Sequence, residues 1–172
     1  MKNAQDMQQP QSVMQESVLK MPTPDGAQQN SIARAWELIE KVRIGMLTTQ
    51  FCGGLRARPL EARVDRNTDL IWFVTDVRGG KDEEIGVAHN IGLAFSDEDA
   101  HVYLSITGRA FVIRDTAQAK AIWKQADDAW FPDGPSDPNV RLLRIEPATA
   151  ELWDGPSSVV AIIFKGVKQR QF

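Results

Sequence analysis

The stretch that decides the fold is HVYLSITGRAFVIR, residues 101–114. Apolar and polar side chains alternate along it, which is the pattern of a strand with one face in the core and one face in water. The sequence therefore predicts that this stretch belongs to an antiparallel sheet. The expected core face consists of Val102, Leu104, Ile106, Ala110 and Val112. The expected wet face consists of His101, Tyr103, Ser105, Thr107 and Arg109.

Further strands are expected on both sides of this stretch. Residues 44–51 and 56–64 flank a Gly-Gly turn and form a predicted hairpin. Residues 70–75, LIWFVT, are apolar on both faces and predict a central strand. The remaining expected strands are 91–95, 140–145 and 149–153.

Helices are expected between these strands. One begins at Asn30 or Ser31 and continues with helical spacing of apolar residues to position 42. A short helix is predicted at 81–89, and a second helix, which Asp115 or Thr116 can cap, is predicted to run to about residue 130. Strands and helices do not alternate, so the expected fold is mainly β (α+β), an antiparallel barrel with flanking helices, and not a doubly wound sheet.

Composition limits the function classes. The chain has 172 residues, which suits one domain at 31–172 behind a flexible tail at 1–30 that is rich in Gln, Met and Pro. The net charge of −3 gives no support for binding nucleic acid or an acidic membrane. Cys52 is the only cysteine, which excludes an internal disulfide and a cysteine metal cluster. No apolar run is long enough to span a bilayer and no secretory signal is visible, so we expect a cytoplasmic protein.

Two arginines stand where a core-facing row begins. Arg56 and Arg58 start one face of the 56–64 strand, and the far end of that face is apolar. Either the guanidinium groups reach solvent at the mouth of a barrel, or they bind an anion, because arginine donors match the geometry of phosphate. The spacing alone leaves both interpretations open.

A glycine turn lies at residues 75–81, TDVRGGK. Gly79 and Gly80 can point backbone amides at one spot, and Lys81 opens a predicted helix whose N-terminus favours anions. The same glycines can serve only to permit a tight turn. Consecutive strands usually lie side by side, so we expect Arg58 and Lys81 to meet at one end of the sheet, where two cations imply a phosphorylated ligand.

The sequence contains none of the conventional catalytic motifs considered next. His89 and His101 form no metal-ligand spacing, and no serine stands in a G-x-S-x-G elbow. Asp127 and Asp128 are interpreted as the solvated face of a helix. Trp153 lies on a polar strand face, which is more typical of an interface residue than of a ligand platform. Catalytic residues stay unknown, no metal is expected, and any chemistry should come from a bound cofactor.

Taken together, these segments resemble the pyridoxamine-phosphate-oxidase-like superfamily of FMN-binding split barrels, and within it the bacterial general stress protein group. The resemblance covers roughly residues 31–155 and depends on the order and spacing of its segments. The segments are RARPL at 56–60, IWFVT…K at 71–81, SITGRAFVIRD at 105–115, WFPDGPSDPN at 130–139 and AELWDG at 150–155.

The resemblance implies a homodimer with FMN bound in two sites between the subunits. It assigns the FMN phosphate to Arg58 and Lys81, with Thr75 nearby. Relatives often carry serine or arginine just before the matching lysine, whereas this chain has glycine there, so the backbone amide of Gly80 is the expected substitute.

For the flavin ring, the resemblance implies contacts from backbone and from the second subunit. The backbone at Leu60 and at Phe73 and Val74 would run beside the ring. Trp153 of the partner subunit would approach it from the other side. The 130–139 segment would lie near the mouth of the site.

The resemblance also implies a function. The expected activity is that of an FMN-dependent oxidoreductase that takes electrons from NADH or NADPH. The alternative is a flavin-binding stress protein without turnover, acting as a reservoir or sensor. True oxidases of the group carry an arginine and a histidine shortly after the tryptophan, and this chain reads GPSSVVAIIF there, so pyridoxamine-phosphate oxidation is not expected. FAD, a deazaflavin or haem stay open as other cofactors.

Overall fold

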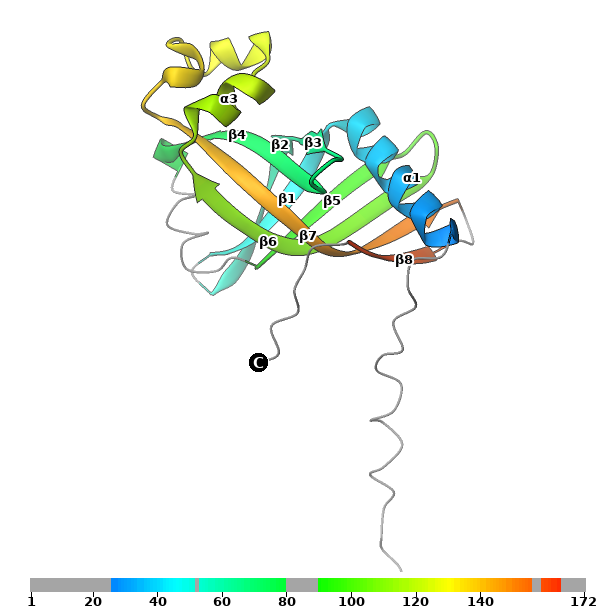
Figure 1. The fold of residues 1–172 in the computed structure, drawn as a ribbon. Helices are drawn as coiled ribbons and strands as arrows, with labels where there is room; N and C mark the ends of the chain where they lie inside the picture. The colour runs from blue at the N-terminus through cyan, green and yellow to red at the C-terminus, as the bar shows by residue number, and fades with distance from the viewer. Residues whose placement is uncertain (1–25, 52, 80–89, 156–158, 165–172) are drawn as a thin grey trace, which may run out of the picture.

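The computed structural model describes residues 26–51, 53–79, 90–155 and 159–164. These residues form one antiparallel sheet of eight strands. The sheet curls into an open barrel, with a long helix packed against one part of it and a short helical cap over another (Figure 1). The predicted fold class is therefore confirmed.

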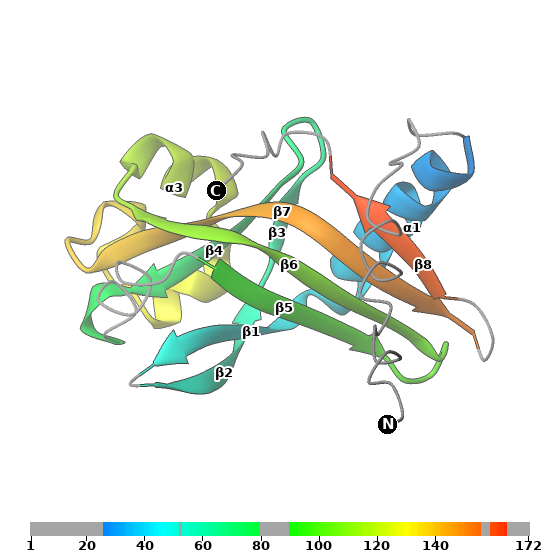
Figure 2. The same ribbon diagram turned by 90° about the horizontal axis from the view of Figure 1, so that it is seen from below.

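All strand pairs in the sheet are antiparallel. The order of neighbours is β2-β1-β5-β6-β7-β4-β3, and β8 pairs with β7 off this path (Figure 2). The strands are β1 (Ile44–Phe51), β2 (Gly54–Glu61), β3 (Arg63–Asp65), β4 (Leu70–Asp76), β5 (Asn90–Asp97), β6 (Val102–Ile113), β7 (Val140–Asp154) and β8 (Val159–Ile163).

The chain itself closes the barrel. β2 and β3 lie at opposite ends of the strand order, yet only Ala62 separates them in sequence. The two ends of the sheet must therefore curl toward each other. β2 pairs with β1 and β3 pairs with β4, and among the described strands no ladder joins β2 to β4. We call this region between β2 and β4 the split.

The β6 strand behaves as its alternation predicts. Val102, Leu104 and Ile106 are buried in the main core, whereas Tyr103 is 40% exposed on the outer face. The pairing with β7 shifts register between Thr107 and Gly108, opposite Pro147. A side chain at Gly108 would place a Cβ only 2.4 Å from the Glu146 carbonyl oxygen, so this close approach requires glycine.

Helix α1 (Gly26–Val42) closes one side of the barrel. Its buried face contains Ala35, Trp36 and Ile39, as the helical spacing predicts. The helix begins at Gly26, before the predicted cap, so residues 26–30 belong to the helix and not to the tail. Among the described residues, no helix has the length and apolar character needed to cross a membrane.

A cap covers the outer face of β4. It comprises α3 (Thr116–Ile122) and the 3-10 turns η2 (Gln125–Ala129) and η3 (Gly134–Ser136). Trp72 and Leu142 from the sheet pack with Ala119 and Phe131 from the cap in a second core. β4 is thus apolar on both faces because a separate core lies on each, although it is next to last in the strand order.

Several boundaries differ from expectation. The predicted strand at 56–64 breaks at Ala62, whose N–H donates to the Arg43 carbonyl at 2.7 Å, where the chain changes partner from β1 to β4. The predicted strands 140–145 and 149–153 are one strand, because Pro147 is accommodated at the bulge opposite β6. The helix predicted to reach residue 130 ends at Ile122. β8 was not predicted, and the helix predicted at 81–89 lies outside the described residues.

Candidate functional site

The inner face of β2 becomes polar toward the split. Arg58 pairs across the ladder with Leu47, which is fully buried, so Arg58 points to the inside of the barrel. Exposure falls along this face, from exposed Arg56 through half-buried Arg58 and Leu60 to buried Ala62. The arginines thus stand at the open end of a face that runs into the main core.

Thr75 lies at the same end of the barrel. The β3–β4 ladder pairs Arg63 with Trp72. From this pair β2 leads back toward Arg58 and antiparallel β4 leads on toward Thr75, so both residues lie on the same side of it. β2 does not pair with β4, so the expectation that these consecutive strands are neighbours is wrong. The two strands flank the split, because β2 leaves β4 to pair with β1.

The buried hydroxyl of Thr75 provides a test of fit for a ligand. Thr75 is only 4% exposed, and its Oγ1 has no hydrogen-bond partner among the described residues. A buried polar atom without a partner costs free energy unless something supplies one. A phosphate oxygen at the split would accept a hydrogen bond from this hydroxyl.

Positive charge gathers at this end of the barrel. Burial, and secondarily the neighbouring charge of Arg56, lowers the pKa of the Arg58 guanidinium below its ordinary value. Arg141 is the cross-strand partner of Thr75 and donates from Nη1 to the Pro138 and Val140 carbonyls at 2.9 Å. A bound anion would offset both the desolvation and the repulsion, so the residues fit a phosphate group.

Of the other predicted site residues, two have side chains buried in the cores and two lie outside the described residues. Phe73 is fully buried in the main core and Val74 packs in the second core, so only their backbone faces the split. Gly80 and Lys81 lie outside the described residues.

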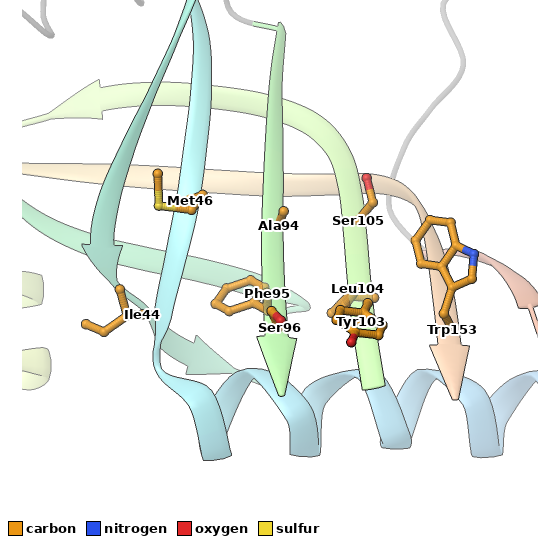
Figure 3. Close-up of a pocket in the computed structure, with 9 residues that line it drawn as sticks. All are labelled: Ile44, Met46, Ala94, Phe95, Ser96, Tyr103, Leu104, Ser105 and Trp153. Carbon is orange, nitrogen blue, oxygen red and sulfur yellow. The ribbon is translucent and has the colours of Figure 1, made fainter. Parts of the chain in front are cut away.

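Trp153 lies on the outer face of the sheet, opposite Tyr103 in the β6–β7 ladder. It lines a hollow of about 330 Å³ on this face, whose lining residues are drawn in Figure 3. The hollow is apolar and open, with Ile44 51% and Met46 42% exposed. Its lining residues are Ile44, Met46, Ala94, Phe95, Ser96, Tyr103, Leu104, Ser105 and Trp153.

Trp153 and the split are at opposite ends of β7. Arg141 marks the split end of that strand, and Trp153 is twelve residues further along. At about 3.3 Å per residue this is up to about 40 Å along the curved strand. The Trp153 side chain lies on the outer face, whereas Arg58 points to the inside of the barrel, so a site shared by both would need Trp153 of the partner subunit.

One buried ion pair, between Arg63 and Asp127, was not predicted from the sequence. Arg63 is buried and its Nη2 donates to both carboxylate oxygens of Asp127, at 2.7 and 2.9 Å. The interpretation of Asp127 as a solvated residue is wrong, because η2 turns this carboxylate inward onto β3. Asp128 is exposed and accepts from the Trp123 indole at 2.8 Å. The alternating pattern gave no signal for a buried Arg63, because Arg63 lies on the strand face opposite Val64, which was expected to be exposed to solvent.

The sequence model of the family described as pyridoxamine 5'-phosphate oxidase like matches residues 30–171. A curated relative, Protein bli-3 of Neurospora crassa, is 25% identical over 113 residues, which span 61% of this chain. The match covers only 54% of that relative's length.

Solved structures share the fold. A general stress FMN/FAD binding protein from Xanthomonas citri is 26% identical with a TM-score of 0.65, covering 81% of this chain and 96% of its own. A putative general stress protein 26 from Jannaschia sp. is 25% identical with a TM-score of 0.65, covering 80% and 99%. A protein related to general stress protein 26 from Clostridium acetobutylicum has a TM-score of 0.69 at 18% identity, covering 78% and 95%, and shows the fold alone. With its split barrel and the family match over most of its length, this chain belongs to the pyridoxamine 5'-phosphate oxidase-like family.

Proposed function

We propose that this protein binds FMN across a homodimer interface and works as a general-stress-type flavoprotein. The observation that carries the proposal is the buried Thr75 hydroxyl on β4, which has no hydrogen-bond partner among the described residues, with the half-buried Arg58 on β2 at the same split. The general stress FMN/FAD binding protein of Xanthomonas citri, which shares the fold, supports a flavin as the ligand.

The roles of the residues follow from their positions. Arg58 and Thr75 hold the phosphate, together with Lys81 and the Gly80 amide of the adjoining segment. A bound flavin supplies the redox chemistry, because it accepts hydride from a reduced nicotinamide. The backbone of Leu60, and that of Phe73 and Val74, lies beside the split and lines the ring. Charged donors at the phosphate end give affinity and orientation without taking part in electron transfer.

The second subunit completes the site. The exposed apolar side chains of Ile44, Met46 and Tyr103 gather around Trp153 on one outer face, which is the kind of patch that a protein interface covers. The position of Trp153 on the outer face, at the other end of β7 from Arg141, supports a partner contribution. We expect light scattering to give a dimer at micromolar concentration, and a monomer that retains flavin would contradict this arrangement.

The phosphate assignment is tested with two flavins. Losing a hydrogen bond to a charged group costs roughly 1.5–3 kcal/mol. At about 1.4 kcal/mol per tenfold, Arg58→Ala should weaken FMN binding about 10- to 150-fold. Riboflavin lacks the phosphate, so its affinity should change far less. Arg66→Ala is the matched control, because Arg66 is exposed and pairs with Glu40 on α1, away from the split. Equal losses for both flavins in calorimetric titration would sink the assignment.

The chemical function is that of an oxidoreductase using NADH or NADPH. Anaerobic addition of the reduced nicotinamide to the FMN-loaded protein should bleach the flavin rapidly. No bleaching would favour the alternative, a flavin-binding stress protein that acts as a reservoir or sensor. Oxidation of pyridoxamine phosphate is not proposed, because residues 155–164, GPSSVVAIIF, contain neither the arginine nor the histidine that the oxidases carry shortly after the tryptophan.

A further inference from the structure

The buried ion pair between β3 and the cap has more contacts than a simple salt bridge. Besides the two bonds to Asp127, Arg63 donates from Nε to the Ile122 carbonyl at 3.1 Å and from Nη1 to the Glu61 carbonyl at 2.9 Å. One planar guanidinium therefore joins the end of β2, the end of α3 and the 3-10 turn η2. Lysine could not make this fork of bonds.

Lys124 reinforces the same junction. Its ammonium donates to the Glu61 carboxylate at 2.7 Å, and its backbone N–H donates to Asp127 at 2.9 Å. The hydrogen bond from Lys124 is the main cause of a lowered pKa at Glu61. Two cations and two carboxylates thus balance in charge where the cap meets the barrel.

Backbone hydrogen bonds continue from Asp127 toward the split. The Asp127 carbonyl accepts the first of them and the Val77 N–H, just after β4, donates the last. Between them the chain turns back on itself in short 3-10 steps. The bonds are Trp130 and Phe131 N–H to Asp127 O, Gly134 N–H to Phe131 O, Asp137 N–H to Gly134 O, Val140 N–H to Asp137 O, and Val77 N–H to Asn139 O at 3.0 Å.

We infer that the Arg63–Asp127 ion pair is a positioning element for the phosphate end of the split. It anchors the cap, and the last residues of the cap fix the Val77 amide, two residues after Thr75. Neither charged residue touches the split itself. The identity of the ligand rests on the proposed flavin function. The link from the ion pair to Val77 rests on the hydrogen bonds alone.

The pair can be removed in two ways that differ in their effect on stability. Asp127→Asn leaves the buried guanidinium with only the Glu61 carboxylate, 3.6 Å away, as counter-charge, and the loss of a partner from a buried pair is destabilising in general. The double variant Arg63→Met/Asp127→Leu replaces the pair by apolar side chains, which buried sites often tolerate. The double variant therefore keeps the experiment decisive if Asp127→Asn fails to fold. Asp128→Asn is the matched control on the neighbouring, exposed carboxylate.

The first measurement is the ratio of FMN affinity to riboflavin affinity. We expect the double variant to lose about 2- to 30-fold in FMN binding, the change produced by a coupling of roughly 0.5–2 kcal/mol. Riboflavin should lose less, because the positioned end carries the phosphate. Leu38→Ala, a core variant on the buried face of α1 at a 2% exposed site, controls for general loss of stability and should leave the ratio unchanged.

The second measurement needs no flavin. Amide hydrogen exchange followed by NMR should show faster exchange at Val77 in the double variant, together with Phe131 and Asp137, while β5 and β6 amides keep wild-type rates. If Val77 stays protected when the cap amides exchange faster, the inference is overturned. If wild type binds no flavin but Val77 does exchange faster in the variant, the proposed function fails and the mechanical link stands.

Discussion

The buried hydroxyl of Thr75 gives a prediction in which two measurements change in opposite directions. Thr75→Val keeps the shape of the side chain and removes Oγ1, which is buried and has no partner among the described residues. A buried, unsatisfied polar group costs about 1–3 kcal/mol. The flavin-free variant should therefore be more stable than wild type. Because about 1 kcal/mol shifts the melting temperature by about 2–4 °C in a chain of this size, the gain is measurable by calorimetry.

The same substitution should weaken the binding of FMN. It removes a hydrogen bond to a charged phosphate, worth roughly 1.5–3 kcal/mol, so FMN affinity should fall about 10- to 150-fold while riboflavin affinity stays near its wild-type value. Thr68→Val is the control at the other end of β4, because the Thr68 hydroxyl already bonds Asp65 at 2.7 Å. That variant should lose stability and leave both flavins unaffected. A flavin-free Thr75→Val protein that melts below wild type would refute the claim that Oγ1 lacks a partner, and equal effects on both flavins would refute the phosphate site.

Three further predictions concern the partner face, the cap and the tail. Trp153→Phe should weaken FMN and riboflavin by similar factors, since the indole is assigned to the ring; titration of both flavins checks this. Lys124→Met removes the hydrogen bond that holds the pKa of Glu61 below its ordinary value. Because a lowered folded-state pKa stabilises above the unfolded value of about 4.3, the stability gap between wild type and variant should be constant near neutral pH. The difference in stability should shrink as the pH falls through the lowered pKa of Glu61. Thermal unfolding of both proteins over a series of acidic pH values tests this. Removal of residues 1–25 should change the melting temperature by no more than about 4 °C, because their composition offers little apolar area to bury; a larger loss would mean that the tail docks.

Local patterns were reliable where one physical cause decides the outcome. The alternation of β6 predicted which side chains are buried, because a strand with one wet face must alternate. Of the two predicted caps of the second helix, Asp115 or Thr116, the structure has Asp115, whose carboxylate accepts from the Gln118 N–H at 2.9 Å. Both are settled within a few residues of chain.

Patterns failed where distant segments compete for the same residues. The break at Ala62 depends on the Arg43 carbonyl and on two rival strand partners, none of which a local pattern contains. β8 was missed because its five residues carry no alternation strong enough to distinguish a strand from a short apolar run. Asp127 was misplaced because its partner, Arg63, is distant in sequence.

The same distinction between local and distant causes applies to the candidate site. The sequence by itself determined an antiparallel barrel, two arginines at the open end of a core-facing row, and the family resemblance that assigned them to a phosphate. Only the tertiary structure decided that the strands of Arg58 and Thr75 flank a split, that Trp153 lies at the far end of β7, and that a buried ion pair anchors the cap. The physical reason is that side-chain periodicity is a local property, fixed by backbone geometry within one strand. Which strand edges pair, and which stay open, is set by burial of the whole sheet and by contacts between residues far apart in the chain.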